Sequence, residues 1–277
     1  MMVFLSIAIV IALLVTIALP IAAAVWINKR LGVGWMVLMY GAIAYFIVQI
    51  FSLLTFSGLL ALVENRTLAL SDRAFIILQL FLSIVVAVLF GVTIRWLGMR
   101  FLKEDLQTVE TAFGFGLGYG GIESVIMVGF PLLTTFISML SNINIDPTSS
   151  SLAPEVIAQI EQLWAVPAYI PLSGIVERIA TLVMHITVTI LILQVFKRKK
   201  TIWLLAAIGD ELLVTVITTS ITELGLGYGW LALASVILAA GNIYLLFRLH
   251  AFDLDLTGKK GKESTEIENE VALIDEV

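Results

Sequence analysis

The sequence has no cysteine, only two histidines and very little charge. Asp, Glu, Lys and Arg make up 13% of the 277 residues, whereas 60% are hydrophobic and the mean hydropathy is +1.05. The lack of cysteine excludes disulfides, thiol nucleophiles and thiolate metal ligands. The lack of charge excludes an ordinary soluble domain, because a surface that faces water needs far more charged residues.

Long apolar runs recur along the chain, and each is long enough to cross about 30 Å of hydrocarbon. We therefore predict an all-α fold, a polytopic membrane helix bundle formed by residues 1–248. The first run has no basic residue before it and is followed by Lys29 and Arg30, which favours a retained helix over a cleaved signal. Seven transmembrane helices are predicted, near residues 3–26, 34–63, 74–100, 113–140, 168–196, 201–222 and 227–248.

Basic residues follow the first, third, fifth and seventh of these spans, and the largest group is the run at residues 197–200. Because cytoplasmic loops carry an excess of Lys and Arg, we predict that the N-terminus lies outside and the C-terminus inside. Residues 249–277 are acidic and poor in apolar residues. They are predicted to form a disordered cytoplasmic tail.

One connection between the predicted spans is long, residues 141–167. It begins with a polar stretch, and Pro154 then opens a short amphipathic pattern. We expect this short helix to lie on the outer membrane surface. The alternative is a lid over a central cavity.

A few ionisable residues lie inside the apolar spans. A charge at the centre of a bilayer costs about 2.5–3.5 kcal/mol on insertion scales, so such residues usually face the interior of the protein or a water-filled cavity. They are the candidates for any chemistry in this chain: Arg95, Glu123, Glu177, Arg178, His185, Asp210 and Glu211.

Three of these residues are expected at one depth. A helix rises about 1.5 Å per residue, which places Glu123, His185 and Asp210 roughly 14–18 Å from the same membrane edge. Asp210 and Glu211 are adjacent and diverge by about 100°, so only one of them can point at the bundle centre. The alternative to a functional cluster is pairing between helices, such as Arg95 with Asp210, or within a helix, such as Glu177 with Arg178.

The fourth span begins with the glycine-rich sequence "FGFGLGYGG". No strand precedes it, which excludes a nucleotide-binding loop. Small residues four apart let a neighbouring helix approach closely, so we favour tight packing of this span over a ligand cavity beside it.

Four stretches carry a resemblance to a known family. They are "IRWLGMRFL" at 94–102, "GLGYGGIES" at 116–124, "ERIATLVMHI" at 177–186 and "AAIGD" at 206–210. In this order they resemble the YhfC-type family of bacterial and archaeal intramembrane metallopeptidases, which is related to the prenyl-protein proteases and bacteriocin-processing enzymes. The resemblance implies a multi-pass protein of a prokaryotic plasma membrane, with a membrane protein or peptide as substrate. It also implies candidate catalytic residues at Glu123, Glu177, Arg178 and Arg95.

The chain departs from the family pattern at several positions. The family carries a Glu-Glu pair before the arginine of the third span, where this chain has Gly91 and Val92. It carries histidines where this chain has Tyr119 and Ala206. The motifs are therefore degenerate, although Asp210 is retained.

The histidine count limits the metal chemistry. A hydrolytic zinc site uses three protein ligands, mostly histidines, and an open position for water. His250 lies in the tail, so the only intramembrane ligand set is His185, Glu123 and Asp210 or Glu211. This is a poor set for a zinc peptidase, and zinc is the only cofactor that the resemblance implies.

We therefore predict a catalytically lapsed relative of these peptidases that binds a membrane protein or a lipid-linked peptide. One alternative is an active peptidase with a His/carboxylate metal site. Another is a proton- or cation-coupled transporter or channel, with the ionisable residues as a relay.

Three further classes of protein find no support. An aspartyl protease would need a second aspartate motif in another span, and a retinal protein would need a lysine inside a span. Nucleic-acid binding has no footprint beyond the basic loop that the topology already explains.

Overall fold

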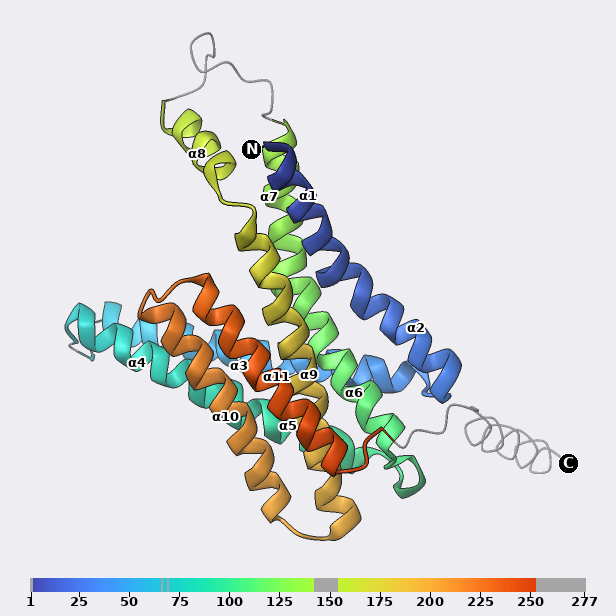
Figure 1. Cartoon of the computed structure of the whole chain (residues 1–277). Helices are drawn as coiled ribbons and strands as arrows, with labels where there is room; N and C mark the ends of the chain where they lie inside the picture. The colour runs from blue at the N-terminus through green and yellow to red at the C-terminus, as the bar shows by residue number, and fades with distance from the viewer. Residues whose placement is uncertain (1, 66, 69, 142–153, 253–277) are drawn as a thin grey trace, which may run out of the picture.

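The computed structural model describes residues 2–65, 67–68, 70–141 and 154–252 (Figure 1). Throughout these described residues the regular elements are helices, which confirms the all-α prediction. Seven helices are long and apolar enough to cross a membrane, and they match the seven predicted spans. The predicted tail lies almost entirely outside the described residues, as does the polar part of the long connection.

Three of the seven spans contain a π-helical turn (η) between two α-helical parts. The elements in chain order are α1 (Met2–Leu13), η1 (Leu14–Ala18), α2 (Leu19–Leu31), α3 (Trp35–Glu64), α4 (Asp72–Val85), η2 (Val86–Phe90), α5 (Gly91–Phe101), the 3₁₀ turn η3 (Glu104–Leu106), α6 (Val109–Glu123), η4 (Ser124–Gly129), α7 (Phe130–Ser141), α8 (Pro154–Ala165), α9 (Tyr169–Arg198), α10 (Ile202–Glu223) and α11 (Tyr228–Arg248).

Helix α9 is the centre of the bundle. In its most apolar stretch 67% of the residues are buried, whereas the other six spans bury between 11% and 33%. Residues 184–194 form an unbroken buried run, and α6, α10 and α11 pack around it (Figure 1). A helix that is apolar on every side and surrounded by other helices belongs in the core, so the outer helices present their own apolar faces to lipid.

Two of the π-helical turns end two residues before a proline. η1 lies just before Pro20, and η4 lies just before Pro131. Proline lacks an N–H and crowds the carbonyl four residues earlier, and a π-helical turn lets the helix continue past it. For Pro20 that carbonyl belongs to Thr16, and the Ser124 hydroxyl donates to it at 3.0 Å. Ser124 thus donates a hydrogen bond to a backbone oxygen that Pro20, without an N–H, cannot reach. Backbone polar groups inside a membrane need such partners, because lipid offers none.

The glycine-rich segment of α6 packs against helices on two sides. A Cβ at Gly118 would overlap the carbonyl oxygen of Leu38 on α3, and a Cβ at Gly116 would lie 2.7 Å from Cα of Ile186 on α9. Gly41 of α3 faces back in the same way, because its Cβ would overlap the backbone of α6. The preference for tight packing over a ligand cavity is therefore confirmed at these glycines.

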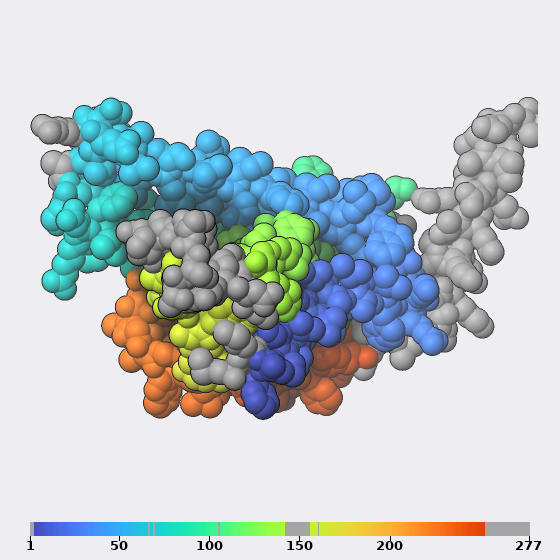
Figure 2. All heavy atoms as spheres, turned by 90° about the horizontal axis from the view of Figure 1, so that it is seen from above, coloured from blue at the N-terminus to red at the C-terminus, as the bar shows by residue number. Residues whose placement is uncertain are grey.

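Helix α8 docks on the ends of α1 and α7. Trp164 is only 5% exposed and packs in a small cluster with Leu5, Ile9 and Met139. Seen from above, the far ends of α3 and α4 (cyan) project to one edge of the molecule, away from α1 (dark blue) (Figure 2).

Candidate functional site

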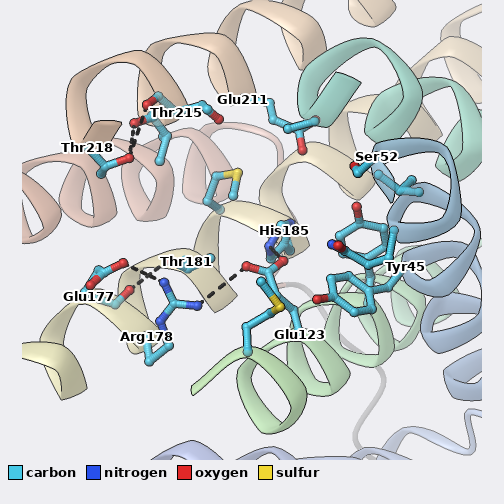
Figure 3. Close-up of a pocket in the computed structure, with 17 residues that line it drawn as sticks. Tyr45, Ser52, Glu123, Glu177, Arg178, Thr181, His185, Glu211, Thr215 and Thr218 are labelled. Carbon is cyan, nitrogen blue, oxygen red and sulfur yellow. Dashed lines mark hydrogen bonds and ion pairs between the residues drawn. The ribbon is translucent and has the colours of Figure 1, made fainter. Parts of the chain in front are cut away.

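A cavity of ≈ 240 Å³ lies between α3, α6, α9 and α10 (Figure 3). Five of the ionisable candidates line it, namely Glu123, Glu177, Arg178, His185 and Glu211. Arg95 is completely buried beside them. No described residue of α8 is among the lining residues, so the structure does not support the alternative that this helix forms a lid.

The sequence-predicted residues reach the cavity from the faces that helical spacing assigns to them. Tyr119 and Glu123 are four residues apart on α6, and Arg178 and His185 are seven apart on α9. All four side chains line the cavity. Helical spacing alone therefore brings residues of two spans to one place.

Asp210 does not join this group. Of the adjacent pair on α10, Glu211 is buried and lines the cavity, whereas Asp210 faces Asn242 on α11. The structure thus brings Glu123 and His185 together and places the third predicted metal ligand elsewhere. The predicted pairing of Arg95 with Asp210 is likewise corrected, because Arg95 pairs with Glu211.

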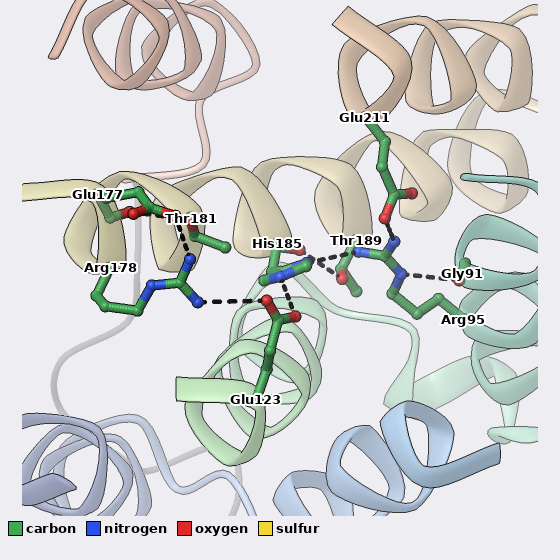
Figure 4. A network of polar contacts seen from close by, with 9 residues as sticks. All are labelled: Gly91, Arg95, Glu123, Glu177, Arg178, Thr181, His185, Thr189 and Glu211. Carbon is green, nitrogen blue, oxygen red and sulfur yellow. Dashed lines mark hydrogen bonds and ion pairs between the residues drawn. The ribbon is translucent and has the colours of Figure 1, made fainter. Parts of the chain in front are cut away.

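The ionisable residues form one continuous chain of contacts (Figure 4). Arg178 pairs with its neighbour Glu177 at 2.6 Å, as predicted, and its other terminal nitrogen lies 3.5 Å from Glu123. The second carboxylate oxygen of Glu123 lies 2.8 Å from Nε2 of His185. The opposite side of the ring faces Arg95, whose guanidinium also binds the Glu211 carboxylate.

The contact with Arg95 determines the tautomer of His185. Arg95 Nη1 lies 3.3 Å from His185 Nδ1, and because a guanidinium has only donors, Nδ1 must accept. The ring proton then lies on Nε2, beside Glu123. That contact is short but poorly aligned, since Nε2 has no hydrogen bond of regular geometry among the described residues. His185 is therefore a neutral ring held between a cation and an anion.

Aromatic rings complete the surroundings of Arg95. Its guanidinium carbon lies 4.4 Å from the centre of the Tyr119 ring, close enough for a cation–π interaction. The same ring lies 4.8 Å from His185 and meets Tyr45 edge to face at 5.5 Å. Tyr119 thus packs against the ion pairs and helps to fix the position of Arg95.

Two glycines make the room that these contacts need. A Cβ at Gly91 would lie 3.1 Å from both Arg95 Nη2 and Glu211 Oε1. A Cβ at Gly120 would lie 2.7 Å from Cδ2 of His185. Arg95 is also fixed along its own helix, because its Nε donates to the Gly91 carbonyl at 2.9 Å.

Sequence reasoning missed two contributors to the site, Gly91 and Tyr45, and it named Glu211 only as the alternative to Asp210. The adjacency of Asp210 and Glu211 showed only that one of the two side chains had to point away from the bundle centre. Tyr45 is 1% exposed, lines the cavity and has no hydrogen-bond partner for its hydroxyl among the described residues. No pattern in α3 distinguishes it from other aromatic core residues.

The residues present do not fit a hydrolytic zinc site, which needs three ligands and an open position. Within the described part of the chain, no group of three or more His, Asp or Glu side chains is arranged to hold a metal ion. His185 Nδ1 faces the guanidinium of Arg95, and Glu123 lies near that of Arg178. A divalent cation at these ligands would lie beside two positive charges.

These features define a class of protein: a multi-pass helical membrane protein with a polar site buried in its bundle. The sequence matches the profile of the YhfC intramembrane metalloprotease family over residues 15–238. The chain belongs to this family. The description of the family makes a metal ion a candidate ligand, although the described residues do not assemble a site for one.

A curated relative supports the assignment. The chain is 27% identical over 200 residues to the uncharacterized membrane protein YhfC of Bacillus subtilis (strain 168), an alignment that covers 69% of this chain and 74% of the relative. No solved structure matches the chain.

Proposed function

We propose that this protein is a catalytically lapsed member of the YhfC family that binds a membrane protein or a lipid-linked peptide. One observation carries the proposal: guanidinium groups lie on both sides of the His185–Glu123 pair, where metal chemistry would need an open position. We place it in a prokaryotic plasma membrane, with the N-terminus outside and residues 1–248 as the membrane domain.

The ion pairs also restrain the groups that would act as acid or base. Glu123 contacts Arg178 and His185 at once, and Glu211 is bound to Arg95. A general base must be free to take a proton from water, and Glu123 is instead held between Arg178 and His185. What remains is a polar cavity inside a membrane protein, which suits binding better than hydrolysis.

Metal analysis of the purified protein tests this proposal. We expect far less than one zinc per chain in protein prepared without chelators, and no change in His185→Ala. His250→Asn is the matched control, since Asn tolerates the backbone φ of 54° at that position. One tightly held zinc per chain that is lost in His185→Ala and kept in His250→Asn would overturn the proposal.

A second candidate is an active intramembrane peptidase, favoured by the 2.8 Å contact between His185 and Glu123. It predicts that a membrane substrate is cleaved and that Glu123→Gln abolishes the cleavage. Processing that is unchanged in Glu123→Gln would remove this candidate.

A further inference from the structure

We propose that the cavity binds a primary ammonium group, carried by the peptide partner as a lysine side chain or a free amino terminus. This inference rests on the proposed function for the partner, and it adds the chemical group that the cavity recognises. It follows from the charge, the acceptors and the apolar wall of the cavity.

The charges of the network do not cancel. Three carboxylates, those of Glu123, Glu177 and Glu211, face two guanidinium groups, those of Arg95 and Arg178. His185 adds no charge, because its Nδ1 accepts from Arg95. With all three carboxylates ionised, the network carries an excess of one negative charge inside a membrane protein, where unpaired charge is costly. A single positive group would balance it.

The cavity presents free acceptors, beside unpartnered donors at Arg178 Nε and the Tyr45 hydroxyl. Glu211 is 4% exposed, and its Oε2 has no hydrogen-bond partner among the described residues. The hydroxyls of Thr181 and Thr218 donate to the backbone carbonyls of Glu177 and Val214, each at 2.9 Å. Their protons are thus engaged within the helices, and the lone pairs of both oxygens remain free to accept. An ammonium group has three N–H donors and no acceptor, which complements these oxygens.

The shape of the cavity favours an organic ammonium over a bare metal ion. Its volume of ≈ 240 Å³ is much larger than one ion and equals the share of about eight waters. Part of its lining is apolar, from Val48, Met127, Met184 and Val214. Such a wall suits the alkyl carbons of a lysine or a peptide terminus, and it offers no ligands to an alkali ion.

Calorimetry on the full chain in phosphatidylcholine nanodiscs tests the inference, because that lipid carries no primary amine. We use hexylammonium as the probe and expect saturable binding of one molecule per chain. Hexanol lacks the charge and hexyltrimethylammonium lacks the N–H donors, so both are expected to bind at least about tenfold more weakly. Equal binding of all three probes would overturn the inference and indicate a merely apolar cavity.

Two matched pairs of variants locate the binding. Thr218→Val is expected to weaken hexylammonium binding about tenfold, whereas Thr222→Val is expected to leave it unchanged. Both hydroxyls bond the carbonyl four residues earlier on α10, but only Thr218 lines the cavity. Glu177→Gln should likewise weaken binding, and the exposed Glu223→Gln should not. Equal effects within either pair would overturn the inference.

Two changes to the calorimetry buffer and lipid identify the chemical class of the bound cation. Sodium chloride should compete no better than N-methylglucamine chloride, and specific competition by sodium would show an alkali-ion site instead. Nanodiscs with phosphatidylethanolamine should leave the affinity unchanged, and a loss would assign the cavity to a lipid amine. The metal analysis is independent: failure of hexylammonium to bind zinc-free protein overturns this inference and leaves the lapsed peptidase intact.

Discussion

The guanidinium of Arg95 lies 3.3 Å from Nδ1 of His185, on the side of the ring opposite to Glu123. The only intramembrane histidine of this chain is thus bonded to a cation through one nitrogen. A nitrogen that accepts from arginine is not available to a metal. This contact therefore argues, together with the degenerate motifs of the sequence, against metal-dependent hydrolysis at the site.

Gly91→Ala tests the room that the Arg95–Glu211 pair needs. The added Cβ would lie 3.1 Å from both side chains, so we expect a loss of about 1–3 kcal/mol in stability. Gly209→Ala is the matched control, because that helical position has open space around it, and it should stabilise by about 0.5–1 kcal/mol. Thermal unfolding in one detergent compares the two, and a Gly91→Ala protein as stable as Gly209→Ala would contradict the packing described here.

Arg95→Met tests whether the buried ion pair works as a unit. Removing one partner leaves the Glu211 carboxylate buried and unpaired, so we expect a loss of about 3–5 kcal/mol. The double variant Arg95→Met with Glu211→Leu should recover most of that loss, since an apolar pair of similar volume is often neutral. Losses that simply add in the double variant would show that the two residues act independently.

Ser124→Ala tests the contact between the two π-helical turns. It removes the donor to the Thr16 carbonyl, and we expect a loss of about 0.6–1.7 kcal/mol, as for hydrogen bonds between membrane helices. Ser141→Ala is the control, because that exposed hydroxyl only bonds its own helix. Equal unfolding temperatures for the two variants would show that the contact does not stabilise the protein.

Gly41→Ala tests the close approach of α3 and α6. The new Cβ would overlap the backbone of α6, which cannot move aside as a flexible side chain can, so we expect misfolding or a loss above about 3 kcal/mol. Gly58→Ala lies on the same helix with nothing near it and should fold normally. The yield of monodisperse protein in detergent compares them, and equal yields would rule out the tight contact.

Much of the fold follows from the sequence, because the apolar runs of about 20 residues are physically required to cross a bilayer. Helical spacing also brings Glu123, Arg178 and His185 to one cavity. The sequence could not show whether Asp210 or Glu211 points into the cavity. That depends on how α10 is rotated about its axis relative to α9, which is determined by packing against neighbouring helices.

The partner of Arg95 was not predictable either. It depends on the space beside Gly91, and one sequence shows neither that space nor the carboxylate that enters it from another helix. The π-helical turns are a similar case. Pro20 and Pro131 lie just after two of these turns, but Ser124 is identified as the compensating donor only by its distance from Thr16.

Nitrogen NMR of protein labelled with ¹⁵N-histidine, titrated with zinc in nanodiscs, tests the central claim most directly. His185→Asn identifies the signals of this ring. The contacts to Arg95 and Glu123 predict a neutral ring protonated on Nε2, whose signals stay unchanged at one equivalent of zinc. A shift of either His185 nitrogen at that equivalence would show a metal ligand and would contradict the account.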